Sequence, residues 1–310
     1  MLNPLLEKDV LPNIQKLLDE GFSASLNVTI PPVTIPSWPC LFSGITPYQL
    51  GYCWFTHPDK GLFNSSKWQK KAIFSISSLR SFVLNVPGTY PAWEINGEII
   101  SGMLSPNLSC YPKELEQKLP ANWIIDGKSI SETFKALEMK SEYFLEKLDE
   151  DFELLVYVIR APDVLSHHAQ EDPQNIRRYI DLAYKKIDDF LGKLMEKDFD
   201  NMFIVSDHGL RPYKKEFNVI KWLQKKGLVS INESIKEMLL SLILKLYGLI
   251  RPFSNINYLK KYYGKILEFI NKNKKLIPKD SNLLRSQNQS SRIRHYSGNV
   301  GALFLNDKSE

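Results

Sequence analysis

The order of the apolar segments is the feature that most limits the folds open to this chain. Two short β-rich runs, FELLVYVI (152–159) and NMFIVS (201–206), stand on either side of a helical pattern over residues 173–196. Neither run alternates strictly between apolar and polar residues, which is typical of strands covered on both faces. A strand–helix–strand order favours parallel pairing. We therefore predict an α/β fold, with a mostly parallel sheet and helices on both of its faces.

Other segments extend this prediction to three regions. Residues 4–20 have the apolar spacing of a helix, and SLNVTI (25–30), AIFSI (72–76) and FVLNV (82–86) are predicted strands. Residues 212–290 are rich in Lys and Asn, helical in period and poor in strand signals, and GALFLN (301–306) reads as a strand. We predict an α/β core over 1–211, a helical cap or insertion over 212–290, and a return strand of the core within 291–310.

Composition excludes several classes of function. The 310 residues are 43% hydrophobic and carry a net charge of only +5, with no recognisable nucleic-acid-binding module. Cys40, Cys53 and Cys110 form neither a metal-binding spacing nor an even disulfide set, which suits a reducing compartment. No secretory signal is visible, and the most apolar run (238–250) is short for a membrane span and is interrupted by Lys245. We predict a cytoplasmic protein without a transmembrane segment, and the sequence leaves its oligomeric state open.

The proline-rich stretch PPVTIPSWPCLFSG (31–44) places a hydroxyl where a helix should begin. Thr34 precedes Pro36 and an apolar run, which predicts an N-cap followed by the first helical turn. One interpretation is only a capped helix. The other is a nucleophile held at the positive end of that helix, where an anionic phosphate would be stabilised.

The strongest local signal is FIVSDHGL (203–210), where an apolar strand delivers Asp207 and His208 at its carboxyl end. Ligands bind at that edge of open α/β sheets. If Gly209 allows a tight bend, both side chains can reach one metal ion. The alternative is a polar turn in which the histidine is hydrogen-bonded to the aspartate.

A second acid–imidazole pair follows the strand at 152–159. Asp163 and His167 are four residues apart and therefore share one face of a helical turn, where they could hold one divalent ion. The neighbouring His168 points elsewhere, and it could support a metal ligand, face the substrate or simply be exposed. Parallel strands would bring Thr34 and both pairs to one sheet edge, where two metals about 4 Å apart could clamp a displacement at phosphorus.

These stretches resemble the alkaline phosphatase superfamily, in particular the type I phosphodiesterase/nucleotide pyrophosphatase family and its microbial phosphohydrolase- and phosphomutase-like members. The resemblance covers most of the chain, in the order PPVTIPSWPCLFSGITPYQLG, LNVPGTYPAWEINGEIISGMLSP, APDVLSHH, FIVSDHGL and RIRHYSGNVGALFLN.

The resemblance implies an alkaline phosphatase-like fold that hydrolyses phosphodiester or nucleotide pyrophosphate bonds of a small phosphorylated substrate. It implies that Thr34 is the nucleophile and a metal ligand. Two divalent ions, Zn²⁺ or alternatively Mn²⁺, would bind at Asp163 with His167 and at Asp207 with His208, and His295 is assigned as a third ligand of the first site.

The resemblance also assigns substrate contacts and exposes departures. Asn85 and Tyr90, in LNVPGTYP, and His168 are the predicted substrate-binding residues, although the first two also fit a simple turn beside the site. Relatives begin with a strand ending in a metal-binding aspartate and continue beyond a strand like GALFLN. The sequence lacks both, which predicts low or no activity. Phosphomutase-like phosphoryl transfer and a non-catalytic truncated family member are the alternative functions.

Overall fold

The computed structural model describes residues 2–57, 60–168, 172, 174–209, 222 and 225–226, and the backbone of 293–295 and 303–305. The chain divides into two compact units, one of residues 1–55 and 62–212, the other of residues 56–61 and 213–310. The domain boundaries expected from the sequence stay predictions. All of the candidate site residues except His295 belong to the first unit.

A four-stranded sheet forms the centre of the first unit. Its strands are β3 (Ser81–Leu84), β4 (Gly97–Ile100), β5 (Cys110–Tyr111) and β6 (Leu154–Tyr157), in the order β5-β4-β3-β6. β3 pairs in parallel with both β4 and β6, so that Val83 lies opposite Ile99 and Val156, whereas β5 is antiparallel to β4. The α/β class is thus confirmed, with a mixed sheet in which three strands are parallel.

One face of this sheet packs on α3 (Thr34–Ser43) and α5 (Ile73–Ile76). Val83 and Ile99 point to this face because side chains alternate along a strand, and they join Ile35 and Phe74 in one buried cluster. Trp68, 2% exposed, completes the cluster and donates a hydrogen bond from its indole to the carbonyl of Gly88.

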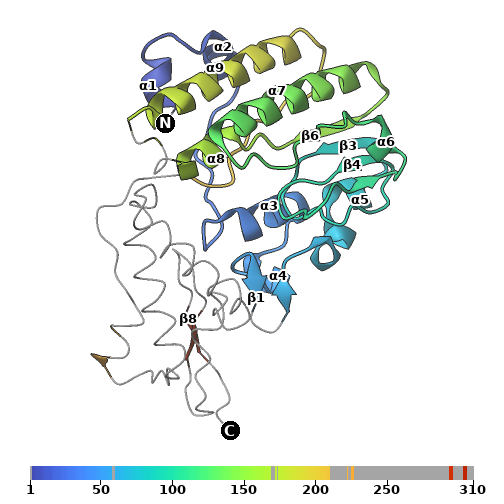
Figure 1. Cartoon of the computed structure of the whole chain (residues 1–310), viewed down its shortest axis with the longest axis vertical. Coiled ribbons are helices and arrows are strands. Elements are labelled where there is room, and N and C mark those ends of the chain that lie inside the picture. Colours follow the sequence, from blue (N-terminus) through green and yellow to red (C-terminus); the bar gives the residue numbers. More distant parts are fainter. Residues whose placement is uncertain are drawn as a thin grey trace, which may run out of the picture. The chain divides into compact units, whose positions relative to one another are not determined.

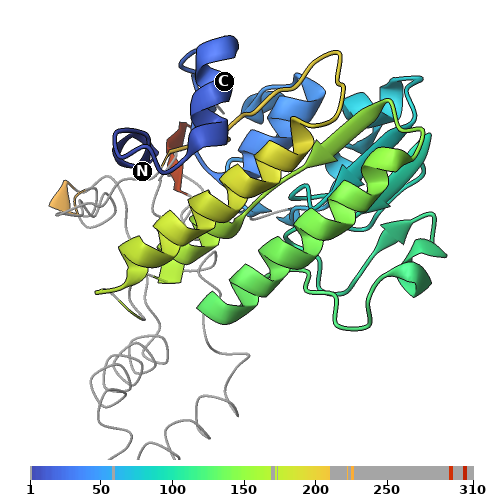
Figure 2. The ribbon, with the colours of Figure 1, turned by 90° about the horizontal axis from the view of Figure 1, so that it is seen from above.

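The opposite face packs on α7 (Ile130–Glu146) and α9 (Ile176–Leu194), which lie side by side over the strands (Figures 1 and 2). Phe82, Leu84 and Ile100 point to this face and contact Phe144 of α7 and Phe190 of α9 in a second cluster. α8 (Ala161–His167) packs against both helices. The prediction of helices on both faces is therefore confirmed, and α8 is held by a third buried cluster, in which its Leu165 joins Leu137 of α7 and Ala183 of α9.

The remaining elements before β7 are short. They are α1 (Asn3–Leu6), α2 (Pro12–Glu20), α4 (Pro47–Leu50), β1 (Thr56–His57), β2 (Gly61–Leu62), η1 (Ser65–Lys67), η2 (Gln69–Lys71), α6 (Leu115–Lys118) and η3 (Lys147–Asp149). In the second unit, β7 (Ile293–His295) and β8 (Leu303–Leu305) form an antiparallel pair. The helical cap expected over 212–290 lies outside the described residues, apart from three isolated positions.

The amino end of α2 is fixed by a side chain from α9. Asp188, 2% exposed, accepts hydrogen bonds from the backbone N–H groups of Ile14 (2.7 Å) and Asn13 (3.2 Å). These groups have no partner within their own helix, because the first turn of a helix leaves its N–H groups unpaired. The Asn13 side chain adds a bond to the same carboxylate at 3.0 Å.

Three sequence predictions of strands are wrong. AIFSI (72–76) forms α5, and neither 25–30 nor 201–206 is a strand. Ile30 and Phe203 are 88% and 84% exposed. Both runs have strand-like composition, but a strand also needs a neighbour to pair with, and these two have none among the described strands. None of the described helices is both long enough and apolar enough to span a membrane.

Candidate functional site

Thr34 stands at the start of α3, where the backbone is irregular. Val33 occupies the N-cap position, and Ile35 has non-helical angles (φ −109°, ψ 114°) before the helix continues. The expectation that Thr34 is the N-cap is therefore wrong by one residue. Its side chain has another partner: Thr34, only 7% exposed, holds its Oγ1 at 3.4 Å from Nε2 of His208.

Asp163 and His167 lie on α8, as the four-residue spacing predicts. Asp163 is in the first turn and His167 is the last residue, with His167 Nε2 3.4 Å from Asp163 Oδ1. The Asp163 side chain is 25% exposed and that of His167 71% exposed. Burial raises the pKa of Asp163, but the contact with His167 and the charges of Arg160, His167 and His208 outweigh it, so the pKa lies below its usual value. The contact with Asp163 raises the pKa of His167.

Asp207 and His208 lie in the irregular segment after residue 206. Asp207 Oδ2 is 3.3 Å from His208 Nε2, and the two side chains are 15% and 14% exposed. The Ser206 hydroxyl donates to the carbonyl of His208 (2.8 Å), which closes the tight bend expected before Gly209. His208 therefore directs one nitrogen toward both Asp207 and Thr34.

The two acid–imidazole pairs are close enough to influence each other. Burial raises the pKa of Asp207, and the charge of Asp163 raises it further, against the opposing effect of His208. The charge of His208 in turn lowers the pKa of Asp163. Carboxylates from two different elements thus repel each other in a half-buried setting, which a bound cation would relieve.

The spacing of the donor atoms fits divalent metal ions. Three pairs of donor atoms are nearly the same distance apart: Thr34 Oγ1 and His208 Nε2 (3.4 Å), Asp207 Oδ2 and His208 Nε2 (3.3 Å), and Asp163 Oδ1 and His167 Nε2 (3.4 Å). These distances are longer than good N–H···O hydrogen bonds. Two donors that bind one tetrahedral ion at about 2.1 Å stand about 3.4 Å apart. The residues present therefore fit a metal as pairs, although no group of three or more His, Cys, Asp or Glu side chains gathers around one point in the described part of the chain.

The other predicted site residues are less closely placed. His168 follows α8 directly and is half-buried, and Tyr90 accepts a hydrogen bond from Ser65 N–H at its backbone carbonyl. Asn85 is buried, and its amide is occupied within the protein: it donates to the carbonyl of Val158 and accepts from Lys140. His295 lies in β7, and its side chain is outside the described residues. These roles stay predictions.

Sequence reasoning missed two cations beside this site. Arg160, between β6 and α8, contacts Asp163 Oδ2 through its guanidinium (3.4 Å) and pairs with Asp126. Its position directly after an apolar strand could have drawn attention to it. Lys140, on α7, is 4% exposed, and nothing in the helical pattern distinguishes it from a surface lysine.

Comparison with known proteins assigns the chain to a family. A family model described as type I phosphodiesterase / nucleotide pyrophosphatase matches residues 2–296. The chain belongs to this family. Membership of the type I phosphodiesterase/nucleotide pyrophosphatase family implies a hydrolase of phosphoester bonds with an alkaline phosphatase-like fold, and the family is generally metal-dependent. Neither the curated proteins nor the solved structures contain a match.

Proposed function

We propose that this chain hydrolyses phosphodiester or nucleotide pyrophosphate bonds, with Thr34 as the nucleophile and two divalent cations at the acid–imidazole pairs. Asp207, His208 and Thr34 would hold one cation, and Asp163 with His167 would hold the other. Zn²⁺ suits a mixed oxygen and imidazole donor set best, and Mn²⁺ is the alternative.

One observation carries the proposal. Thr34 and His208 are 174 positions apart in sequence, yet Thr34 Oγ1 lies 3.4 Å from His208 Nε2. Two ligands of one tetrahedral metal ion are about this far apart. A threonine that only capped its helix would direct its oxygen at backbone N–H groups of its own first turn. Thr34 instead faces the acid–imidazole pair, as a nucleophile requires.

The residues of the chain have distinct parts in such a reaction. When bound, the cations supply Lewis-acid stabilisation of charge on the phosphate oxygens. The Thr34 hydroxyl releases its proton to solvent, Oγ1 forms a bond to phosphorus, and the bond to the leaving oxygen breaks as that oxygen takes up a proton from solvent. Water then attacks the phosphorus of the threonine ester, which still carries the other ester group of the substrate, and frees Thr34 and the phosphate monoester. Because Thr34 is buried in α3, its oxygen is held in place before substrate arrives, which favours attack.

The proposal is tested with protein stripped by a chelator and reloaded with Zn²⁺ or Mn²⁺. Hydrolysis of bis(p-nitrophenyl) phosphate is followed together with the intact mass of acid-quenched protein, because one transfer to Thr34 is detectable even where turnover is slow. We expect metal-dependent product and a Thr34 that carries a p-nitrophenyl phosphate group. Thr34→Val keeps the shape of the side chain and should lose both signals, by at least about a thousandfold in rate.

Thr46→Val is the matched control, because the Thr46 hydroxyl bonds only within its own turn, to Gln49. It should keep both signals. Wild-type rates in Thr34→Val would overturn the role of the nucleophile. If neither metal binds and no phosphate is transferred, the chain is a non-catalytic family member. Phosphate that passes to an added alcohol rather than to water would support phosphomutase-like transfer instead.

A further inference from the structure

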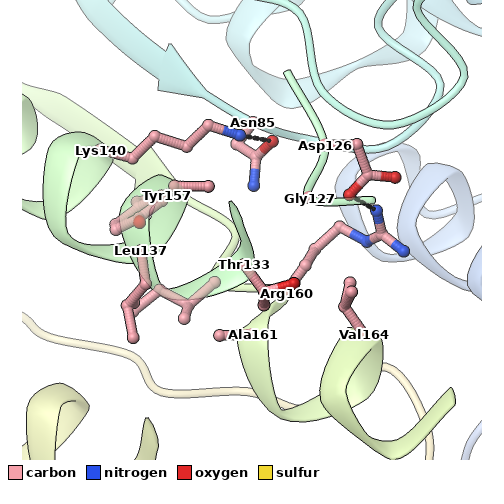
Figure 3. A pocket seen from close by; sticks show the side chains of 12 residues that line it. Asn85, Asp126, Gly127, Thr133, Leu137, Lys140, Tyr157, Arg160, Ala161 and Val164 are labelled. Atoms are coloured by element: carbon pink, nitrogen blue, oxygen red, sulfur yellow. Dashed lines mark hydrogen bonds and ion pairs between the residues drawn. The ribbon is translucent and has the colours of Figure 1, made fainter. Parts of the chain in front are cut away.

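A small cavity with both charged and apolar lining residues lies between the end of β3, α7 and the start of α8 (Figure 3). Its volume is about 20 Å³, which is space for one or two water-sized atoms. Lys140 and Arg160 supply its positive charge and Asp126 its negative charge, and Leu137 and Val164 contribute apolar walls.

Lys140 is the unusual member of this cavity. It is 4% exposed, and its ammonium donates to two neutral acceptors, Oδ1 of Asn85 (2.8 Å) and the carbonyl of Ile125 (2.7 Å). The third N–H has no acceptor, and no carboxylate lies within ion-pair distance, among the residues that the structure describes. Buried lysines are almost always paired, because removing a charge from water is costly. An anionic group in the cavity would supply the missing partner.

Arg160 joins this cavity to the proposed catalytic site. Its guanidinium pairs with Asp126 on one side and contacts Asp163 Oδ2 at 3.4 Å on the other. Asn85 holds Lys140 in place while its own backbone is left-handed (φ 62°), a conformation that is uncommon outside glycine and is often found at functional sites. A ligand in the cavity would therefore lie next to a group bound at Asp163.

We propose that this cavity is a subsite for a carboxylate, carried by a substrate whose phosphoester reacts at Thr34. The claim that the carboxylate belongs to the substrate rests on the proposed function, whereas the binding of a carboxylate in this cavity does not. The small cavity favours a planar carboxylate, which brings only two oxygens to the Lys140 ammonium, over the bulkier tetrahedral phosphate with its four oxygens. The apolar walls suit the carbon atoms to which such a carboxylate is attached.

The protonation of Lys140 adds a second expectation. Burial lowers the pKa of Lys140; the charge of Asp126 opposes this effect and that of Arg160 adds to it, and the pKa is about 7 as the net result. The tyrosine hydroxyl of Tyr157, which also lines the cavity, has a pKa raised by burial and stays neutral. A bound carboxylate needs the ammonium form, so affinity should fall as the pH rises through about 7.

The experiment measures binding to the metal-free full-length chain by NMR chemical-shift titration, with acetate, acetamide and inorganic phosphate as the probes. We expect acetate to bind, acetamide to bind at least about tenfold more weakly, and phosphate to produce no shifts around Lys140. Lys140→Met should weaken acetate binding by about tenfold or more. Lys135→Met, an exposed lysine on the same helix, is the matched control and should bind acetate as the wild type does.

The pH series keeps the test decisive if Lys140→Met does not fold. Wild-type affinity for acetate should fall from about pH 6 to about pH 8.5, as Lys140 loses its proton. Equal binding of acetate and acetamide, undiminished binding in folded Lys140→Met, or an affinity that ignores pH would each overturn the proposal. Thr34→Val should still bind acetate, so failure of the catalytic proposal and failure of this one give different results.

Discussion

Thr34 Oγ1 lies 3.4 Å from His208 Nε2, so two residues that are 174 positions apart in sequence are neighbours in the fold. If they act as one catalytic unit, their substitutions should not add. We expect Thr34→Val and His208→Ala each to reduce kcat of bis(p-nitrophenyl) phosphate hydrolysis strongly, and the double variant to be about as slow as the slower single one. Steady-state kinetics of the three variants check this. Multiplicative losses would show that the two side chains act independently.

Asp207 is the one carboxyl group among the described residues whose pKa is clearly raised. Its pKa is raised above the usual value of 3.8, so the folded state holds the proton more tightly than the unfolded state does. Stability from this group is therefore lost as the pH rises through the folded pKa. We expect metal-free Asp207→Asn to melt at a higher temperature than the wild type at neutral pH. Calorimetry checks this, and a lower melting temperature would contradict the account.

Bound metal should reverse the order of the melting temperatures of the wild type and Asp207→Asn. Zn²⁺ or Mn²⁺ at about a hundredfold excess over its Kd should stabilise the wild type by about 2.7 kcal/mol, because only the folded state presents the site. Asp207→Asn should gain much less, because the neutral amide is a poorer ligand. A gain equal to that of the wild type would place the metal elsewhere.

The pair of His167 and Asp163 makes metal binding depend on pH. The pKa of His167 is raised by its contact with Asp163, and a bound metal must displace the proton that this contact retains. Affinity for Zn²⁺ should therefore rise with pH through and above the usual histidine pKa of 6.5. Calorimetric titration at several pH values checks this. In His167→Gln the pH dependence should be reduced, and an unchanged dependence would assign it to other groups.

Lys140 should leave a signature in the stability of the fold. Its pKa is about 7 in the folded protein and 10.5 ordinarily, so in that window the unfolded chain binds more protons. Stability therefore increases with pH there, by at most roughly 1.4 kcal/mol per pH unit for one group. The difference in unfolding free energy between wild type and Lys140→Met should grow in favour of the wild type from about pH 7 to about pH 9. Urea titrations measure it, and a constant difference would contradict the assignment.

Asp188 should matter for stability and not for catalysis. Asp188→Ala leaves the half-buried N–H groups of Asn13 and Ile14 without this acceptor and should cost about 1–2 kcal/mol. Asp189→Ala, at the exposed neighbouring position, should stay within about 0.5 kcal/mol of the wild type. Denaturant unfolding distinguishes the two variants. Equal effects would show that the contact with α2 contributes little.

The elements predicted correctly from the sequence are those in which the local residue pattern and the tertiary packing favour the same structure. β3 and β6 lie where apolar runs place them, because both of their faces pack in the core, and α9 lies where helical spacing places it, because its apolar side packs on the second cluster. The pairing of Asp163 with His167 follows from helical geometry alone. The strands expected at 25–30 and 201–206 are wrong because composition does not supply a pairing partner. AIFSI has strand-like residues but forms one turn of helix against the sheet.

The charged cavity could not be predicted in the same way. Lys140 is one of two lysines on the amphipathic helix α7, and only the fold shows that this one faces inward, to Asn85 and Ile125. Arg160 and Asp126 are 34 positions apart, so their contact is equally invisible in a local pattern. The roles of His168, Tyr90 and His295 remain predictions from the family resemblance.

Arg160 has one guanidinium for two neighbours, Asp126 at the cavity and Asp163 at the acid–imidazole site. A ligand that draws the guanidinium toward one of these two carboxylates weakens its interaction with the other carboxylate. Thermodynamic linkage then requires the influence to run equally in both directions. Whatever factor a guest in the cavity imposes on metal affinity, the metal must impose the same factor on the guest.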